Sequence, residues 1–221
     1  MKGTFKCRRC VNDAVSCVTK SGLNGGVERV ESFVYLGDTL NAGGGCLNAV
    51  TARVRVGWMK FKGLSEILCG KKWSLLMKGR VNRACVRAAM IYGGEIWLMR
   101  REDEGVLQRA ERAMVRLMCE IKWRERKSSK ELMMMMGLEE NIVTVVRRSR
   151  LRWYGHVLRR DEEVGIRKVL NFEVNGVAVR GRPHLGWTEQ VENDRVKAGL
   201  RDVDAGDRCT WRKGISTFHH R

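Results

Sequence analysis

The chain has 221 residues and a formal net charge of +18, because its 43 lysines and arginines outnumber its 25 aspartates and glutamates. Apolar residues make up 43% of the sequence, which excludes a disordered polyelectrolyte and predicts a folded protein with a buried core. No apolar run approaches the roughly 18 residues that would span a bilayer, so we expect no membrane partner. The excess of positive charge favours a polyanionic partner, above all RNA or DNA.

The N-terminal segment, residues 1–29, is polar and shows no periodicity, which predicts a loose structure. Within it Cys7 and Cys10 have the CxxC spacing of a zinc knuckle, and Cys17 is a weaker third candidate ligand. Because no fourth ligand lies nearby in the sequence, we expect no bound metal and no cofactor. The segment lacks the apolar stretch of a secretory signal, so we expect the eight cysteines to stay reduced inside a cell.

A short strand or hairpin is predicted for residues 31–40, ESFVYLGDTL, which contain four consecutive apolar residues from Phe33 to Leu36. The glycine run that follows, NAGGG, suits a turn. The expected fold class is mostly α, with this strand or hairpin near the N-terminus followed by a helical bundle and C-terminal helices.

Apolar residues recur every three or four positions through the middle of the chain, which predicts amphipathic helices. We expect one helix over residues 47–68, a second from an N-cap at Ser74, a third over 102–119, and a short fourth that Gly137 ends. The second helix is predicted to bury Met77, Val81, Cys85, Ala88 and Tyr92. The third is predicted to bury Leu107, Ala110, Met114 and Leu117.

Three further helices are predicted downstream. The first covers residues 141–160, which contain six arginines and no acidic residue. The second begins at a Thr188 N-cap and ends near Gly199. The third covers residues 204–215.

Arginines recur on one face of three predicted helices, opposite the apolar residues. A single set of this kind is more typical of a solvated face that keeps a protein soluble. Three sets, combined with the charge of +18, favour a surface that follows the phosphates of a nucleic acid. The sets are Arg80, Arg83 and Arg87; Arg109, Arg112 and Arg116; and Arg148, Arg152 and Arg159.

The single proline of the chain lies in the basic sequence Arg-Gly-Arg-Pro, residues 180–183. We expect Arg180 and Arg182 to contact phosphates, with Gly181 allowing a close approach. The same four residues form the core of AT-hooks, so sequence-specific reading of a narrow minor groove is the alternative. Trp187 follows this loop and is the tryptophan that we expect to contact a base.

Six blocks of the sequence resemble, in the same order, the C-terminal part of reverse transcriptases encoded by LINE-type, non-LTR retrotransposons. The resemblance covers about residues 28–215, and its blocks read FVYLGDTL, ARVRVGWMKFKGL, IYGGEIWLMRREDEGVLQRAERAMVRLMC, RLRWYGHVLRR, RGRP and DRCTWRKGI. The resemblance implies three parts: a loose segment over 1–29, an end-of-palm strand with thumb-like helices over 30–125, and a helical extension with the basic loop over 126–221. It also implies descent from an RNA-directed DNA polymerase of a mobile element.

The catalytic residues of that family are absent from this chain. In the family, the paired catalytic aspartates precede the YLG strand, whereas this sequence contains no Asp-Asp pair. Polymerase chemistry needs such carboxylates to hold two metal ions. We therefore expect no catalytic residue and no polymerase activity, as for the tail of a truncated element.

Two functions follow as hypotheses. In the first, the chain is a non-catalytic fragment that grips the backbone of RNA or of a template-primer duplex through its arginine-rich helix faces. In the alternative, it is a helical interaction module or an inert relic that self-associates through exposed apolar faces. The alternative predicts exposure of Leu36, Trp97 and the methionine run Met133–Met136.

Overall fold

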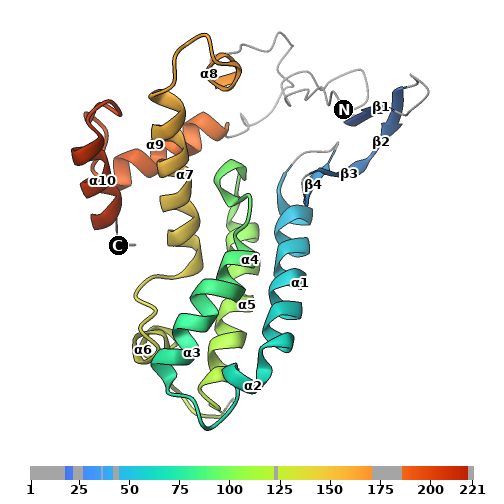
Figure 1. Ribbon diagram of the computed structural model, residues 1–221, viewed down its shortest axis with the longest axis vertical. Helices are drawn as coiled ribbons and strands as arrows, with labels where there is room; N and C mark the ends of the chain where they lie inside the picture. The colour runs from blue at the N-terminus through green and yellow to red at the C-terminus, as the bar shows by residue number, and fades with distance from the viewer. Residues whose placement is uncertain are drawn as a thin grey trace.

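The computed structural model describes residues 18–21, 27–35, 37–41, 45–121, 124–170 and 186–218. The protein is mostly helical, with a two-stranded hairpin near the N-terminus followed by helices, which confirms the predicted fold class (Figure 1). No helix in these residues is long and apolar enough to cross a membrane.

The predicted hairpin consists of strands β3 (Ser32–Tyr35) and β4 (Asp38–Asn41), which pair antiparallel. The connection between them contains Gly37 at φ 78°, a left-handed conformation that glycine adopts without a steric cost. The hairpin turn therefore falls inside ESFVYLGDTL, before the NAGGG run in which the sequence suggested a turn.

A second hairpin lies within the N-terminal segment for which the sequence predicts a loose structure. Strands β1 (Val18–Ser21) and β2 (Val27–Val30) pair antiparallel, with Val18 opposite Val30. Valine and threonine favour extended backbone, which explains why these short stretches form strands despite the polar composition around them.

Helices make up the rest of the described chain. The first predicted helix, residues 47–68, is broken at Leu64, directly after Gly63, a residue type with low helix propensity. The N-terminal set is α1 (Leu47–Gly63), α2 (Ser65–Leu68), α3 (Leu75–Val81), the π-helix η2 (Asn82–Arg87), α4 (Ala88–Met90), the 3-10 turn η3 (Gly94–Ile96), α5 (Arg101–Met118) and α6 (Ser129–Met135). The C-terminal set is α7 (Ile142–Leu158), α8 (Gly165–Leu170), α9 (Trp187–Lys197) and α10 (Arg208–Thr217).

The second predicted helix begins where expected but buries a different face. Ser74 is the N-cap of α3, and its hydroxyl accepts a hydrogen bond from the amide of Met77 at 3.3 Å. The helix then widens into η2, whose longer turn keeps residues four apart on one side. The buried residues are Lys78, Asn82, Val86 and Met90. The predicted face is wrong, because Met77, Cys85, Ala88 and Tyr92 are exposed and Val81 is only half-buried.

The third and fourth predicted helices, α5 and α6, follow the sequence pattern more closely. Along α5, Leu107, Ala110 and Met114 are buried as expected, whereas Leu117 is half exposed and the neighbouring Met118 is buried in its place. Gly137 follows α6 at φ 64°, which confirms it as the residue that ends this helix.

The two C-terminal helices begin at other residues than the sequence suggests. Gly186 is the N-cap of α9, which places Thr188 inside the helix. Gly199, at φ 68°, ends that helix as expected. The last helix starts after Asp207, whose carboxylate accepts the amides of Cys209 and Thr210 at 3.1 Å each. Because its carboxylate accepts hydrogen bonds from two backbone amides, Asp207 is the N-cap of this helix, and not Asp204, at which the sequence suggested that the helix begins.

The helices surround two apolar cores that share α7. The first core lies among α1 to α6 and the first half of α7 and includes Val146. The second core contains Leu151 from the other half of α7 together with residues of α9 and α10. Figure 1 shows α7 running from the lower bundle to the two C-terminal helices. The change between the cores thus falls inside α7.

Buried ion pairs fix α7 against the helices on either side. Arg150 is fully buried, and its guanidinium donates to the carboxylate of Asp194 on α9 at 2.6 Å and to the carbonyl of Trp97 at 3.1 Å. Arg147 pairs with Glu104 on α5 at 2.7 Å. Because a buried charge without its partner is costly, these contacts allow one placement of α7 between α5 and α9.

The apolar residues expected to be exposed in an interaction module are partly in the core. Trp97 is only 3% exposed, and Met133 and Met136 are buried, whereas Met134 and Met135 are exposed. That expectation is therefore wrong for Trp97 and for half of the methionine run. Leu36 lies outside the described residues.

Candidate nucleic-acid interface

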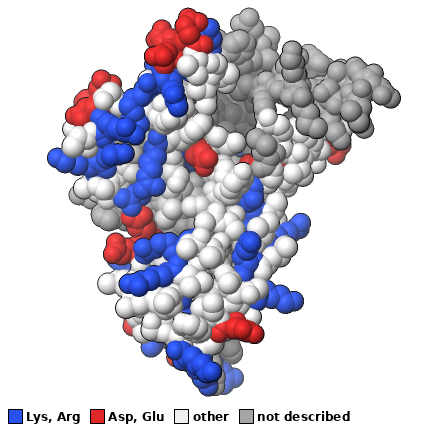
Figure 2. All heavy atoms as spheres, in the orientation of Figure 1, with Lys and Arg blue, Asp and Glu red and all other residues white. Residues whose placement is uncertain are grey.

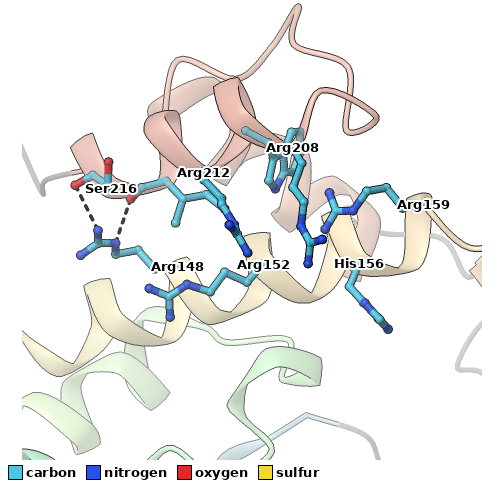
Figure 3. A pocket seen from close by; sticks show the side chains of 9 residues that line it. Arg148, Arg152, His156, Arg159, Arg208, Arg212 and Ser216 are labelled. Carbon is cyan, nitrogen blue, oxygen red and sulfur yellow. Dashed lines mark hydrogen bonds between the residues drawn. The ribbon is translucent and has the colours of Figure 1, made fainter.

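A basic pocket lies between α7 and α10. Its volume is about 450 Å³. From α7 come Arg148, Arg152 and Arg159, which the sequence places on one helix face, and from α10 come Arg208 and Arg212 (Figure 3). The remaining lining residues are His156, Trp211, Ile215 and Ser216. The third predicted arginine set is thus brought together with two further arginines 49 or more positions away.

The contact that places α10 against α7 depends on a glycine and a tryptophan. A Cβ atom at Gly155 would lie 2.5 Å from Nε1 of Trp211, so only glycine permits this approach. The Trp211 indole is buried and donates to the carbonyl of Leu151 at 3.2 Å. Since residues three and four apart share a helix face, burial of Trp211 turns Arg208 and Arg212 toward α7.

Two of the five arginines are held by the protein itself. Arg148 donates to the carbonyls of Ile215 at 2.8 Å and Ser216 at 3.0 Å, and it also pairs with Glu140. Arg159 donates to the carbonyl of Ala205 at 2.9 Å. Glu140 offsets the charge of Arg148, whereas the carbonyl of Ala205 orients the Arg159 guanidinium without cancelling its charge, so the pocket keeps a net positive charge from its other four arginines.

The other three, Arg152, Arg208 and Arg212, have no hydrogen bond or ion pair to any described part of the chain. Partial burial, followed by the nearby charges of Arg208 and Arg212, lowers the pKa of Arg159. Guanidinium groups this close repel one another, and that repulsion is relieved when an anion lies between them. The pocket can therefore hold a polyanion through charge-assisted hydrogen bonds.

The first predicted arginine set divides between surface and core. Arg80 is exposed, and Arg83 is exposed and donates to the carbonyl of Gly137. Arg87 is only 5% exposed and donates to Glu111 at 2.7 Å and to the carbonyl of Glu140 at 2.5 Å. The expectation that Arg87 belongs to a surface is wrong, because the wider turn of η2 directs it into the bundle.

The second predicted set lies on α5, away from the pocket. Arg109 and Arg112 are exposed, and Arg116 is half-buried and donates to the carbonyl of Glu125 at 3.3 Å. Figure 2 shows lysines and arginines gathered beside the C-terminal helices and in separate groups over the lower bundle. The structure does not bring the three predicted arginine sets together into one groove. Contact of the α5 set with phosphates stays a prediction.

Trp187 is half-buried and packs against the second core. Its ring lies edge-on against Tyr154, with 6.1 Å between centroids, and its indole donates to the carbonyl of Glu95 at 3.1 Å. It does not line the α7–α10 pocket, and its contact with a base stays a prediction. Arg180 and Arg182 of the basic loop, and the thiols of Cys7, Cys10 and Cys17, lie outside the described residues.

The described residues contain no group of three or more histidine, cysteine or acidic side chains that could hold a metal ion. Cys46, a buried thiol that donates to the carbonyl of Leu98 at 3.2 Å, has its pKa raised by burial and by Asp103. A thiol that stays protonated is a poor nucleophile, so this cysteine has a packing role.

Sequence analysis did not single out Arg208 and Arg212 as site residues. Their spacing of four, on either side of Trp211, is the signal that could have found them, since it puts two charges beside a buried aromatic ring. What the spacing alone could not indicate is the helix against which that ring packs.

Comparison with known proteins gives one similarity. The chain is 23% identical over 192 residues, 84% of its length, to an uncharacterized transposon-derived protein of Caenorhabditis elegans. The matched region is 66% of that protein. No protein-family model and no solved structure matches the chain. The similarity suggests a transposon origin.

Proposed function

We propose that this chain is a non-catalytic nucleic-acid-binding protein of transposon origin that holds RNA or DNA by its phosphates in the α7–α10 pocket. The observation that carries the proposal is the convergence of five arginines from two helices, three of them without a partner among the residues that the structure describes. Binding of a phosphate backbone to such a cluster releases condensed counterions, which supplies affinity independently of base sequence.

We further propose that the parent element is a LINE-type retrotransposon and that the chain corresponds to the C-terminal part of its reverse transcriptase. Two of the six blocks that carry this resemblance, RLRWYGHVLRR and DRCTWRKGI, lie in α7 and α10. These blocks form the two walls of the pocket. A shared phosphate-binding role would explain why they resemble that family.

The proposal includes no polymerase chemistry. Two-metal catalysis of nucleotide transfer needs adjacent carboxylates, and the sequence has no Asp-Asp pair. The side chains that line the pocket donate hydrogen bonds and carry positive charge, which suits binding and positioning of a strand.

The dependence of RNA affinity on salt tests the proposal. We expect a log-log slope of about −2.8 for four phosphate contacts on a single strand, because the fifth arginine, Arg148, is paired with Glu140. The double variant Arg152→Ala with Arg212→Ala removes one unpartnered arginine from each wall and should reduce the slope by about 1.4. Fluorescence anisotropy of labelled RNA, from low to physiological salt, measures both.

The matched control removes two positive charges from positions outside the pocket. Arg55 on α1 and Arg126 before α6 are exposed, do not line the pocket, and have no partner in the described ranges. Their double alanine variant should keep most of the slope. The proposal fails if the wild-type chain does not bind at low salt, or if the control loses as much of the slope as the pocket variant.

A further inference from the structure

We propose that the α7–α10 pocket accepts a single nucleic-acid strand between its two arginine-bearing walls and excludes a duplex. This inference rests on the proposed function and specifies the form of its ligand. Its basis is the arrangement of the arginines on two facing helices, since that arrangement determines from which directions a phosphate backbone is contacted.

The two walls differ in length. Arg148 to Arg159 covers 11 positions of α7, or about 16 Å at a rise of 1.5 Å per residue. Arg208 and Arg212 are one helical turn apart on α10, about 6 Å by the same rise. At the rise of roughly 3.4 Å per nucleotide of a stacked strand, the longer row faces at most about four or five nucleotides, and fewer of an extended strand. The pocket therefore matches a short segment of backbone and not an isolated anion.

The arginines approach the pocket from opposite sides. Figure 3 shows Arg208 and Arg212 reaching from α10 toward α7, on which Arg148, Arg152 and Arg159 lie in a row. A ligand in this pocket meets guanidinium groups on both flanks. Only a backbone that enters between the helices can use both rows at once.

The size of the pocket excludes the body of a duplex. Its volume is about 450 Å³, and it lies where α10 packs against α7. The major groove of B-DNA alone is about 12 Å wide and can itself admit an α-helix, so a whole duplex is too large to enter a pocket of this volume. A duplex would reach only the rim of the pocket, where it cannot contact both rows.

The floor of the pocket gives little opportunity to recognise nucleobases. Trp211 and Ile215 are the apolar lining residues, and both are almost completely buried beneath the arginines. Their side chains are used in the second core, which leaves guanidinium groups, suited to phosphates, as most of the accessible lining. Since Arg148 and Arg159 are already oriented by carbonyl groups, binding orders fewer side chains.

The test compares the affinity of the full chain for an unstructured oligouridine with its affinity for a blunt RNA duplex of the same length. We expect the single strand to bind about tenfold more tightly at the same salt concentration. The double variant Arg208→Ala with Arg212→Ala removes one wall and should weaken single-strand binding by about tenfold but duplex binding by less than about threefold. The Arg55→Ala with Arg126→Ala control should preserve the preference for the single strand.

The same titration with oligothymidine distinguishes RNA from DNA as the source of the strand. Similar affinities for oligouridine and oligothymidine support recognition of phosphates. A preference of more than about tenfold for either one would contradict contact with phosphates alone. Equal binding of strand and duplex, or equal losses in the α10 variant, overturns the single-strand proposal and leaves nucleic-acid binding in place. If neither strand nor duplex binds, both proposals fail.

Discussion

At the scale of single residues, burial decides what an arginine does. Arg80 and Arg87 belong to one predicted basic set, yet Arg80 is exposed and Arg87 lies in the core with a carboxylate partner. A guanidinium in solvent is available to a phosphate, whereas one that neutralises Glu111 is committed to the fold. The same contrast separates Arg152, which faces the pocket, from Arg150, which is buried against Asp194.

Replacing Arg87 by methionine should therefore destabilise the protein by about 3 to 5 kcal/mol, because it leaves the carboxylate of Glu111 buried without its charged partner. Arg80→Met, at an exposed position, should change stability by less than about 0.5 kcal/mol. Urea unfolding followed by circular dichroism measures both. Arg87→Lys keeps a positive charge and should recover part of the loss; equal stability of the two methionine variants would refute the assignment.

At the scale of helices, the pocket exists because α10 lies very close to α7. The approach needs a residue without a side chain at Gly155, where Trp211 occupies the space that a Cβ would fill. The indole cannot yield easily, because it is enclosed and hydrogen-bonded to Leu151. Close packing at one glycine thus controls the position of two arginines of the proposed interface, Arg208 and Arg212.

We predict that Gly155→Ala lowers the free energy of unfolding by about 1 to 3 kcal/mol through overpacking. Gly63 provides the matched control, since a Cβ there meets no atom within 4 Å. Gly63→Ala at the end of α1 should raise stability by about 0.5 to 1 kcal/mol, because alanine has the better helix propensity. Thermal unfolding should move in opposite directions for the two variants, and a shift in the same direction would contradict the packing argument.

At the scale of the whole molecule, α7 connects the two cores. Its first half contributes Ile142, Val143 and Val146 to one, and its second half contributes Leu151 to the other. Neither core is complete without this helix. Loss of either core removes contacts that keep α7 folded, which couples the two unfolding reactions.

We expect the chain to unfold in one cooperative transition. Far-ultraviolet circular dichroism, which reports on all helices, and tryptophan fluorescence, which depends in part on Trp211 in the second core, should give the same midpoint in urea. Leu200→Ala, a large-to-small change in the second core, should lower both midpoints together. Two separated transitions would show that α7 does not couple the cores.

Periodicity and end signals in the sequence were sufficient for the helical fold class, for the Ser74 cap and Gly137 terminus, and for the shared face of Arg148, Arg152 and Arg159. These features depend on residues a few positions apart, whose geometry a helix determines by itself. Tertiary structure alone decided that η2 turns Arg87 inward, that Trp187 packs against the second core, and that α10 adds Arg208 and Arg212 to the α7 row. Each of these outcomes depends on which distant surface a helix packs against, and that choice is made by close contacts such as Gly155 with Trp211, which no local pattern encodes.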